Sequence, residues 1–408
     1  MKKHLLFVFM ISCAFSFAQW STTSNNTSID VISAFSKVYS SDGFTNGLFE
    51  STDNGNTWTN SNTGVPSAGV EFGVLHNGNL YAYKNNTVFV STTGNNWTSM
   101  TGAFGATDII KGMTVHSGTV YAATSPLSGG GFKIFTLNGS SWALKSSFTQ
   151  TIINNIASVN GALFGGTTAN GVIKSTDNGQ TFTNSSSGMP TQAPHKSVLC
   201  FAPVSGGMLA GTYGGKICRS TDNGATWTSV YDIGDNSLFI GINEFYIHST
   251  NEIFAATDSG FVYTLNGGLN WQKSNSGLNY ANFEYLMKHV TVSGSYIVAG
   301  VNTMVGSKIV RMPLNQIITS IKKNTISLNS KVYPNPSSGL VNFNSNAFTS
   351  LENISVNIIN VTGKLITSYS ISDVNTVIDF SSFENGLYFY EINSEGERIE
   401  TGKLLIQH

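Results

Sequence analysis

Residues 220–227 read Ser-Thr-Asp-Asn-Gly-Ala-Thr-Trp, and nearly the same octapeptide occurs at 51–58 and again at 175–182. In each copy an Asn-Gly pair follows the aspartate, and these residue types favour tight turns because they tolerate a left-handed backbone. Strand-like runs flank the copies. The octapeptide is therefore predicted to be a turn that ends one strand and leads, through its final aromatic residue, into the next.

Three weaker copies extend this pattern and end at Trp97, Trp142 and Trp271. The six aromatic ends stand at positions 58, 97, 142, 182, 227 and 271, so the intervals between them are 39, 45, 40, 45 and 44 residues. Hairpin-type dipeptides such as Asn77-Gly78 and Asn160-Gly161 recur with the same period. A period of about 40–45 residues with several short strands per unit is typical of β-propeller blades.

The number of blades depends on how the ring closes. A seventh unit follows the six that carry the turn, with strands predicted at 290–292, 296–300 and 308–312, but it lacks an outer strand. Trp20 lies 38 residues before Trp58 and begins a segment that is similar to those after the other turns. We therefore expect seven blades, with the segment at Trp20 completing the last one. Six blades is the alternative.

The octapeptide resembles the Asp-box, also called the bacterial neuraminidase (BNR) repeat, of sialidase-like propellers. Each aspartate is expected to accept hydrogen bonds from nearby backbone N–H groups, which is a structural role. One carboxylate per turn is too few for a calcium loop of the EF-hand kind. The structural residues of the repeats are then Asp53, Trp58, Trp97, Trp142, Asp177, Phe182, Asp222, Trp227 and Trp271.

Both ends of the chain carry features of an exported protein. Lys2 and Lys3, an apolar run and a small-x-small site ending at Ala18 predict a signal peptide over residues 1–18. The propeller is then expected over 19–312 and a linker over 313–328. Charged residues make up 11% of the chain, and 21 basic residues nearly balance 22 acidic ones, so neither nucleic acid nor a membrane surface is an expected partner. No transmembrane segment is expected in the mature chain.

Residues 329–408 carry a different pattern. A Tyr-Pro-Asn-Pro element at 333–336, an Asn-Val-Thr-Gly-Lys element at 360–364 and a Glu-Asn-Gly-Leu-Tyr element at 384–388 occur in order. In order and spacing they resemble the type A sorting domain of the type IX secretion system. The resemblance implies a small β-sandwich, interaction with that secretion machinery, and export through the periplasm. The mature protein is then secreted or held at the outer-membrane surface.

The sialidase-like resemblance does not extend to sialidase chemistry. Sialidases of this fold hold the substrate carboxylate with three arginines, because guanidinium groups bind carboxylates in a bidentate manner. The whole chain has three arginines, of which Arg398 belongs to the sorting domain and Arg219 directly precedes a box turn. The sequence therefore argues against sialidase activity. For other catalysis it gives no decision, and we favour a non-catalytic role.

A ligand is expected on the face away from the box turns, near blades five to seven, where inter-blade loops are long. The residues predicted to contact it are Asp232, Asp235, Asp258, Tyr213, Tyr280 and Glu284. We assign no catalytic residue, no metal site and no cofactor, although these carboxylates would suit a divalent cation. The expected function is recognition of extracellular glycans or surface proteins. A glycoside hydrolase or lyase and a structural surface-coat component are the alternatives.

Overall fold

The computed structural model describes residues 20–408 except for 24–29, 42–46, 68, 101, 103, 128, 150, 234–239, 279–285, 304–305, 319–329, 345–353, 362–363, 372 and 395–396. The chain divides into two compact units, Met1–Ile318 and Thr319–His408. Each unit is described separately.

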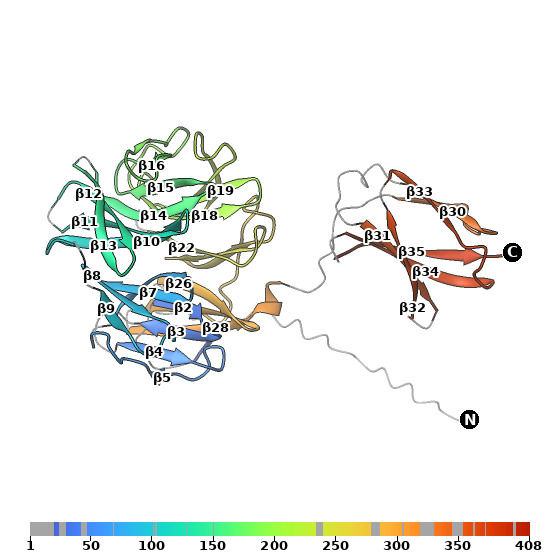
Figure 1. The fold of residues 1–408 in the computed structure, drawn as a ribbon, viewed down its shortest axis with the longest axis horizontal. Helices are drawn as coiled ribbons and strands as arrows, with labels where there is room; N and C mark the ends of the chain where they lie inside the picture. Colours follow the sequence, from blue (N-terminus) through green and yellow to red (C-terminus); the bar gives the residue numbers. More distant parts are fainter. Residues whose placement is uncertain are drawn as a thin grey trace, which may run out of the picture. The chain divides into compact units, whose positions relative to one another are not determined.

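The described residues of the first unit form seven four-stranded antiparallel sheets, which we call blades one to seven (Figure 1). Blade one contains β2 (Asp30–Ala34), β3 (Lys37–Ser41), β4 (Leu48–Ser51) and β5 (Thr59–Asn60); blade two β6 (Glu71–His76), β7 (Asn79–Lys84), β8 (Thr87–Ser91) and β9 (Thr98–Met100); blade three β10 (Asp108–His116), β11 (Thr119–Pro126), β12 (Phe132–Asn138) and β13 (Ser141–Phe148); blade four β14 (Ile153–Val159), β15 (Ala162–Thr167), β16 (Val172–Ser175) and β17 (Thr183–Asn184). Blade five contains β18 (Val198–Val204), β19 (Gly207–Thr212), β20 (Lys216–Ser220) and β21 (Thr228–Asp232); blade six β22 (Ile242–Ile247), β23 (Ile253–Thr257), β24 (Gly260–Thr264) and β25 (Gln272–Lys273); blade seven β26 (Leu286–Ser293), β27 (Tyr296–Thr303), β28 (Gly306–Pro313) and β1 (Ser21–Thr22).

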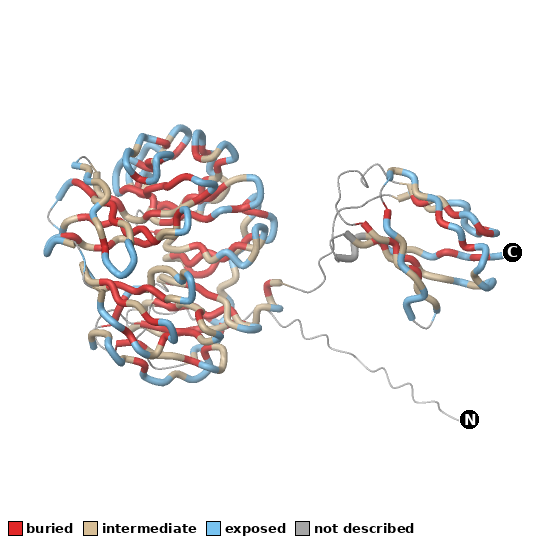
Figure 2. The backbone as a smooth tube through the Cα atoms, in the orientation of Figure 1, coloured by how far each residue is buried: buried red, intermediate tan, exposed pale blue. Residues whose placement is uncertain are grey.

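The core of the propeller lies within and between these blades. The first strands of successive blades pack side by side around the ring, and β26 packs against β2. Second strands are the most buried, and β15 is buried along its whole length. Figure 2 shows buried residues along the strands and exposed residues in the connecting turns. The apolar alternation of the repeats therefore fills the space between neighbouring sheets.

The box turn joins the third and fourth strands through a short hydrogen-bonded network. In blade one the Ser51 hydroxyl donates to Asp53 Oδ1 at 2.8 Å and accepts from the Gly55 N–H. Asp53 also accepts from the backbone N–H and the hydroxyl of Thr57. The same bonds recur around Asp177 and Asp222. Hydrogen bonds from the following threonine lower the pKa of each of these two carboxyls to about 2.

Except for the weak copy in blade three, where nothing lies close to Gly139, the box turns also contact the blade that precedes them. Gly224 has a φ of +81°, and a Cβ there would lie 2.5 Å from the Phe164 ring of blade four. The residue before the glycine also has a left-handed backbone, and its carbonyl accepts a hydrogen bond from the preceding blade. Lys174 Nζ donates to Asn223 O at 2.7 Å, and Tyr121 Oη donates to Asn178 O at 3.3 Å. The turn therefore fixes both the hairpin within a blade and the contact between blades.

The N-terminal segment closes the ring. β1 pairs antiparallel with β28, with Ser21 opposite Arg311 and Thr22 opposite Val310. Trp20 is 2% exposed and packs on Phe261 of blade six with the two ring centroids 5.2 Å apart. Its indole N–H donates to Ser274 O at 2.8 Å. The first and last parts of the propeller are thus joined in one sheet, in which β1 covers the edge of β28.

The second unit is a sandwich of two sheets. One has the strand order β29 (Lys331–Tyr333), β30 (Leu340–Asn344), β33 (Asn375–Asp379), and the other β32 (Leu365–Ile371), β31 (Ile354–Asn360), β34 (Gly386–Ser394), β35 (Glu397–Ile406). Apolar residues from both sheets form one core. The Asn335 side chain bonds the backbone of Lys403 and Leu405, so the first sequence element lies beside the last strand. Across the described residues, no helix has the length and hydropathy of a membrane span.

We predict that Trp20→Ala lowers the free energy of unfolding of the propeller by about 3–5 kcal/mol, as for other large buried side chains. Urea unfolding followed by tryptophan fluorescence would measure it. Trp58→Ala is the matched control, because Trp58 is only partly buried and should lose less. Equal losses for the two variants would contradict the role of Trp20 in closure.

Candidate ligand-binding site

The predicted contact residues are only partly within the described structure. Asp235, Tyr280 and Glu284 lie outside the described residues. Asp232 ends β21 and forms an ion pair with Lys216 of the neighbouring strand. Tyr213 follows β19 in the same blade, and its N–H donates to Ser197 O. Asp232 and Tyr213 therefore lie at one end of blade five.

Asp258 is engaged inside the protein. Its side chain is 5% exposed and forms a 2.7 Å ion pair with Lys288 of blade seven. It also accepts hydrogen bonds from the Gly241 N–H and from Asn243 Nδ2. These contacts tie blade six to blade seven. Asp232 and Asp258 are thus held in separate ion pairs, each with its own lysine.

The two described arginines of the propeller have structural partners. Arg219 Nε donates to Gly267 O in the box turn of blade six. Arg311 lies over the Tyr296 ring, with 4.4 Å from its guanidinium carbon to the ring centroid, and donates to Asn56 Oδ1 of blade one. Each side chain therefore bonds its own blade to the box turn of the next blade.

A charged cluster joins the first strands of blades six, seven and one. His289 Nδ1 lies 3.3 Å from Asp30 Oδ1 and 3.4 Å from Glu244 Oε2. Burial raises the pKa of Asp30 to about 6, against the opposing effect of His289. Burial alone would lower the pKa of His289, but the carboxylates of Asp30 and Glu244 raise it to about 9. Near neutral pH the His289 ring is therefore charged and forms ion pairs with Asp30 and Glu244.

Among the described residues, no group of three or more His, Cys, Asp or Glu side chains is arranged to hold a metal ion.

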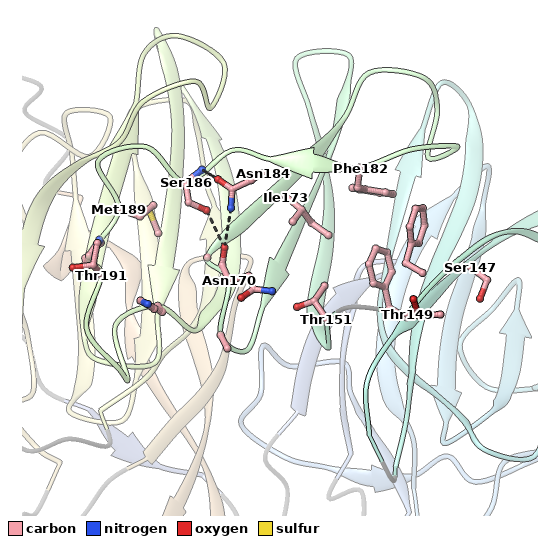
Figure 3. A pocket seen from close by; sticks show the side chains of 16 residues that line it. Ser147, Thr149, Thr151, Asn170, Ile173, Phe182, Asn184, Ser186, Met189 and Thr191 are labelled. Atoms are coloured by element: carbon pink, nitrogen blue, oxygen red, sulfur yellow. Dashed lines mark hydrogen bonds between the residues drawn. The ribbon is translucent and has the colours of Figure 1, made fainter.

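A cavity of about 660 Å³ lies between blades three and four (Figure 3). This volume is within the range of about 300–1,000 Å³ that is usual for small-ligand sites. Blade three contributes the ends of β12 and β13, and blade four contributes β16, the segment at 169–171 and the connection to blade five. The cavity therefore lies between blades three and four and not among blades five to seven, where we expected the ligand.

The junction at the cavity lacks a segment that three of the other junctions have. After the outer strands of blades one, four and six, a segment of Ser-x-Ser/Thr-Gly follows, at 61–64, 185–188 and 274–277. Its third residue accepts a hydrogen bond from the backbone N–H of the next blade's tryptophan: Thr63 from Trp97, Ser187 from Trp227, and Ser276 from Trp20. Blade three has no such segment after β13, and phenylalanine replaces tryptophan at position 182.

One side of the cavity is aromatic. Phe132 and Phe148 are stacked with centroids 4.4 Å apart, and Phe182 stands edge-on to Phe148 at 5.4 Å. Phe132 is buried, whereas Phe148 and Phe182 remain partly exposed. Ile173 extends this apolar surface.

The other side is polar, as Figure 3 shows for Asn170, Asn184 and Ser186. The Ser186 hydroxyl donates to Asn170 O at 3.0 Å, and Asn184 Nδ2 approaches the same oxygen at 3.5 Å. Gly171, with a φ of +71°, brings this turn close, because a Cβ there would lie 2.5 Å from Ser186 Oγ. A ligand between the two sides would meet aromatic rings and amide or hydroxyl groups together.

The cavity was not predicted from the sequence, because the prediction used the turn, period and strand pattern that the repeats have in common. The available signal was a departure from the repeat: Phe182 at a tryptophan position, after a blade without the Ser-x-Ser/Thr-Gly segment.

Comparison with known proteins assigns the tail and the fold. Residues 331–407 match the secretion system C-terminal sorting domain. The chain thus carries a type IX sorting tail, which implies export to the cell surface or secretion and engagement with that machinery. No curated protein matches the chain.

Solved structures that resemble the chain are β-propellers. The extracellular domain of a hybrid two-component system from B. thetaiotaomicron has a TM-score of 0.55 at 12% identity, over 83% of this chain and 45% of that one. Our chain therefore spans less than half of that extracellular-domain chain. Streptogramin B lyase has a TM-score of 0.57 at 13% identity, over 72% and 97% of the two chains. YCF48 bound to D1 peptide has 0.53 at 14%, over 74% and 97%. Identities this low show the fold alone.

We predict that the charged cluster makes the propeller less stable in alkaline solution. The pKa of His289 is raised to about 9 from 6.5, so its stabilising effect is complete below pH 6.5 and is lost as the pH rises through 9. The side chain is 35% exposed, so the loss should be less than about 1 kcal/mol. Thermal unfolding at pH 7 and pH 10 would measure it, and His289→Gln should reduce the difference. An unchanged difference in that variant would contradict the assignment.

We also predict that deletion of residues 329–408 leaves the protein in the periplasm of its native host, because the sorting domain lies in that segment. Immunoblots of periplasm, cell surface and medium would locate the truncated chain. Export of truncated and full-length protein in equal amounts would disprove the prediction.

Proposed function

We propose that this protein is an exported recognition module that binds an extracellular glycan or surface protein in the cavity between blades three and four. The observation that carries the proposal is the cavity itself, which combines partly exposed aromatic rings with amide and hydroxyl groups. Ligand sites usually combine an apolar lining with a few polar groups that orient the ligand. The sorting tail places such a module outside the cell.

The lining favours binding over hydrolysis. A glycoside hydrolase needs two carboxyl groups about 5–10 Å apart. None of the residues that line the cavity is an aspartate or glutamate. The propeller of streptogramin B lyase has a similar fold, but at 13% identity the likeness carries no activity to this chain. A coat component, the other alternative, would not need a cavity of this size.

Asn184→Ala tests the proposal, with Asn60→Ala as the matched control. The two asparagines occupy equivalent repeat positions, and each accepts a hydrogen bond from the backbone two residues later, at 3.1 Å and 3.2 Å. Only Asn184 lines the cavity. Loss of one neutral hydrogen bond to a ligand should weaken binding about 2- to 10-fold.

The binding measurement would use a glycan array and extracts of surface proteins, with affinities for the hits from calorimetry. We expect Asn184→Ala to weaken binding and Asn60→Ala to leave it unchanged. Equal affinities for both variants, or a ligand mapped to another part of the propeller, would refute the assignment of the cavity.

A further inference from the structure

The lining of the cavity contains one positively charged side chain and no negatively charged one. Lys196 is exposed and is the one charged residue among those that line it. Among the described residues Lys196 takes part in no ion pair. A ligand in this cavity therefore meets a positive charge that no carboxylate of the described residues neutralises. This favours an anionic group on the ligand, since a charge-assisted hydrogen bond is stronger than a neutral one.

Polar side chains line the same cavity as Lys196. Asn170 uses only its backbone groups in hydrogen bonds within the described structure, so its carboxamide is available to a ligand. Thr149, Thr151 and Thr191 add hydroxyl groups to the lining. Amides and hydroxyls both donate and accept, which matches ligands rich in hydroxyl groups.

Three main-chain groups at the cavity are already paired. The Gly171 N–H donates to Lys196 O, and Thr151 O accepts from the Gly131 N–H. Asn170 O accepts from Ser186. A peptide that adds as a strand needs free main-chain groups at a sheet edge. At these three positions the cavity offers side chains rather than main-chain groups, which favours a saccharide over an extended peptide.

We propose that the cavity selects a saccharide that carries a carboxylate, such as a uronic acid unit, and that Lys196 binds the carboxylate. The partly exposed rings of Phe148 and Phe182 would contact the apolar face of the sugar. This inference rests on the proposed function, because it names the ligand class for the same cavity.

The test uses the full-length protein and uronate trisaccharides of the galacturonate, glucuronate and mannuronate types. Their methyl esters keep size and hydroxyl pattern but lack the negative charge. Lys196→Met is compared with Lys145→Met, which removes a charge from β13 outside the cavity lining. We expect Lys196→Met to weaken binding of an acid about tenfold or more and to leave the ester unaffected. Lys145→Met should change neither affinity.

The outcomes separate this inference from the proposal on which it rests. Equal binding of acids and esters, with loss only in Asn184→Ala, would overturn the carboxylate and keep the cavity as a binding site. Tighter binding of an acidic peptide such as oligoglutamate, weakened by Lys196→Met, would overturn the saccharide. If no ligand responds to Asn184→Ala or Lys196→Met, the cavity is not the site and both proposals fail.

Discussion

The contact between a box turn and the preceding blade, present in five of the blades, is the constraint on which the propeller depends. The turn holds its own aspartate in hydrogen bonds to the following threonine, and its glycine lies against the neighbouring sheet. A side chain at Gly224 would collide with Phe164, so the glycine sets how closely two blades can pack. The carbonyl before it then accepts a hydrogen bond from the same neighbour, as Asn223 does from Lys174. The residues that shape the turn therefore also set the packing between neighbouring blades.

The ring closes only when its last blade, blade seven, has all four strands. Blade seven supplies three strands from the end of the propeller and takes its fourth from Ser21–Thr22. Trp20 occupies the place that Trp97 and Trp227 hold in other blades, and its N–H finds the equivalent carbonyl, Ser276 O. Arg311 adds a bond from blade seven to the box of blade one. Closure therefore uses the same tryptophan contact as the junctions after blades one and four.

The candidate site lies where this repetition fails. Between blades three and four the segment that follows blades one, four and six is absent, and a phenylalanine takes the tryptophan position. The space left over is lined by three phenylalanines and by the polar turn at Asn170. By contrast, the carboxylates of Asp232 and Asp258 are bound to lysines. In a protein made of repeats, an irregular junction offers a ligand both space and unused side chains.

The sequence by itself was enough to predict an all-β propeller, its period and the sorting tail, because these follow from local signals. The box turn is encoded in eight consecutive residues, and the apolar pattern of each strand is read within a few residues. Even the pairing of β1 with β28 could be anticipated, since the spacing from Trp20 to Trp58 matches the repeat. The cavity, the cluster of Asp30, Glu244 and His289, and the pairing of Asp258 with Lys288 were decided only by the tertiary structure. They depend on which side chains of different blades come within a few ångströms of each other, and no local pattern in the sequence specifies that distance.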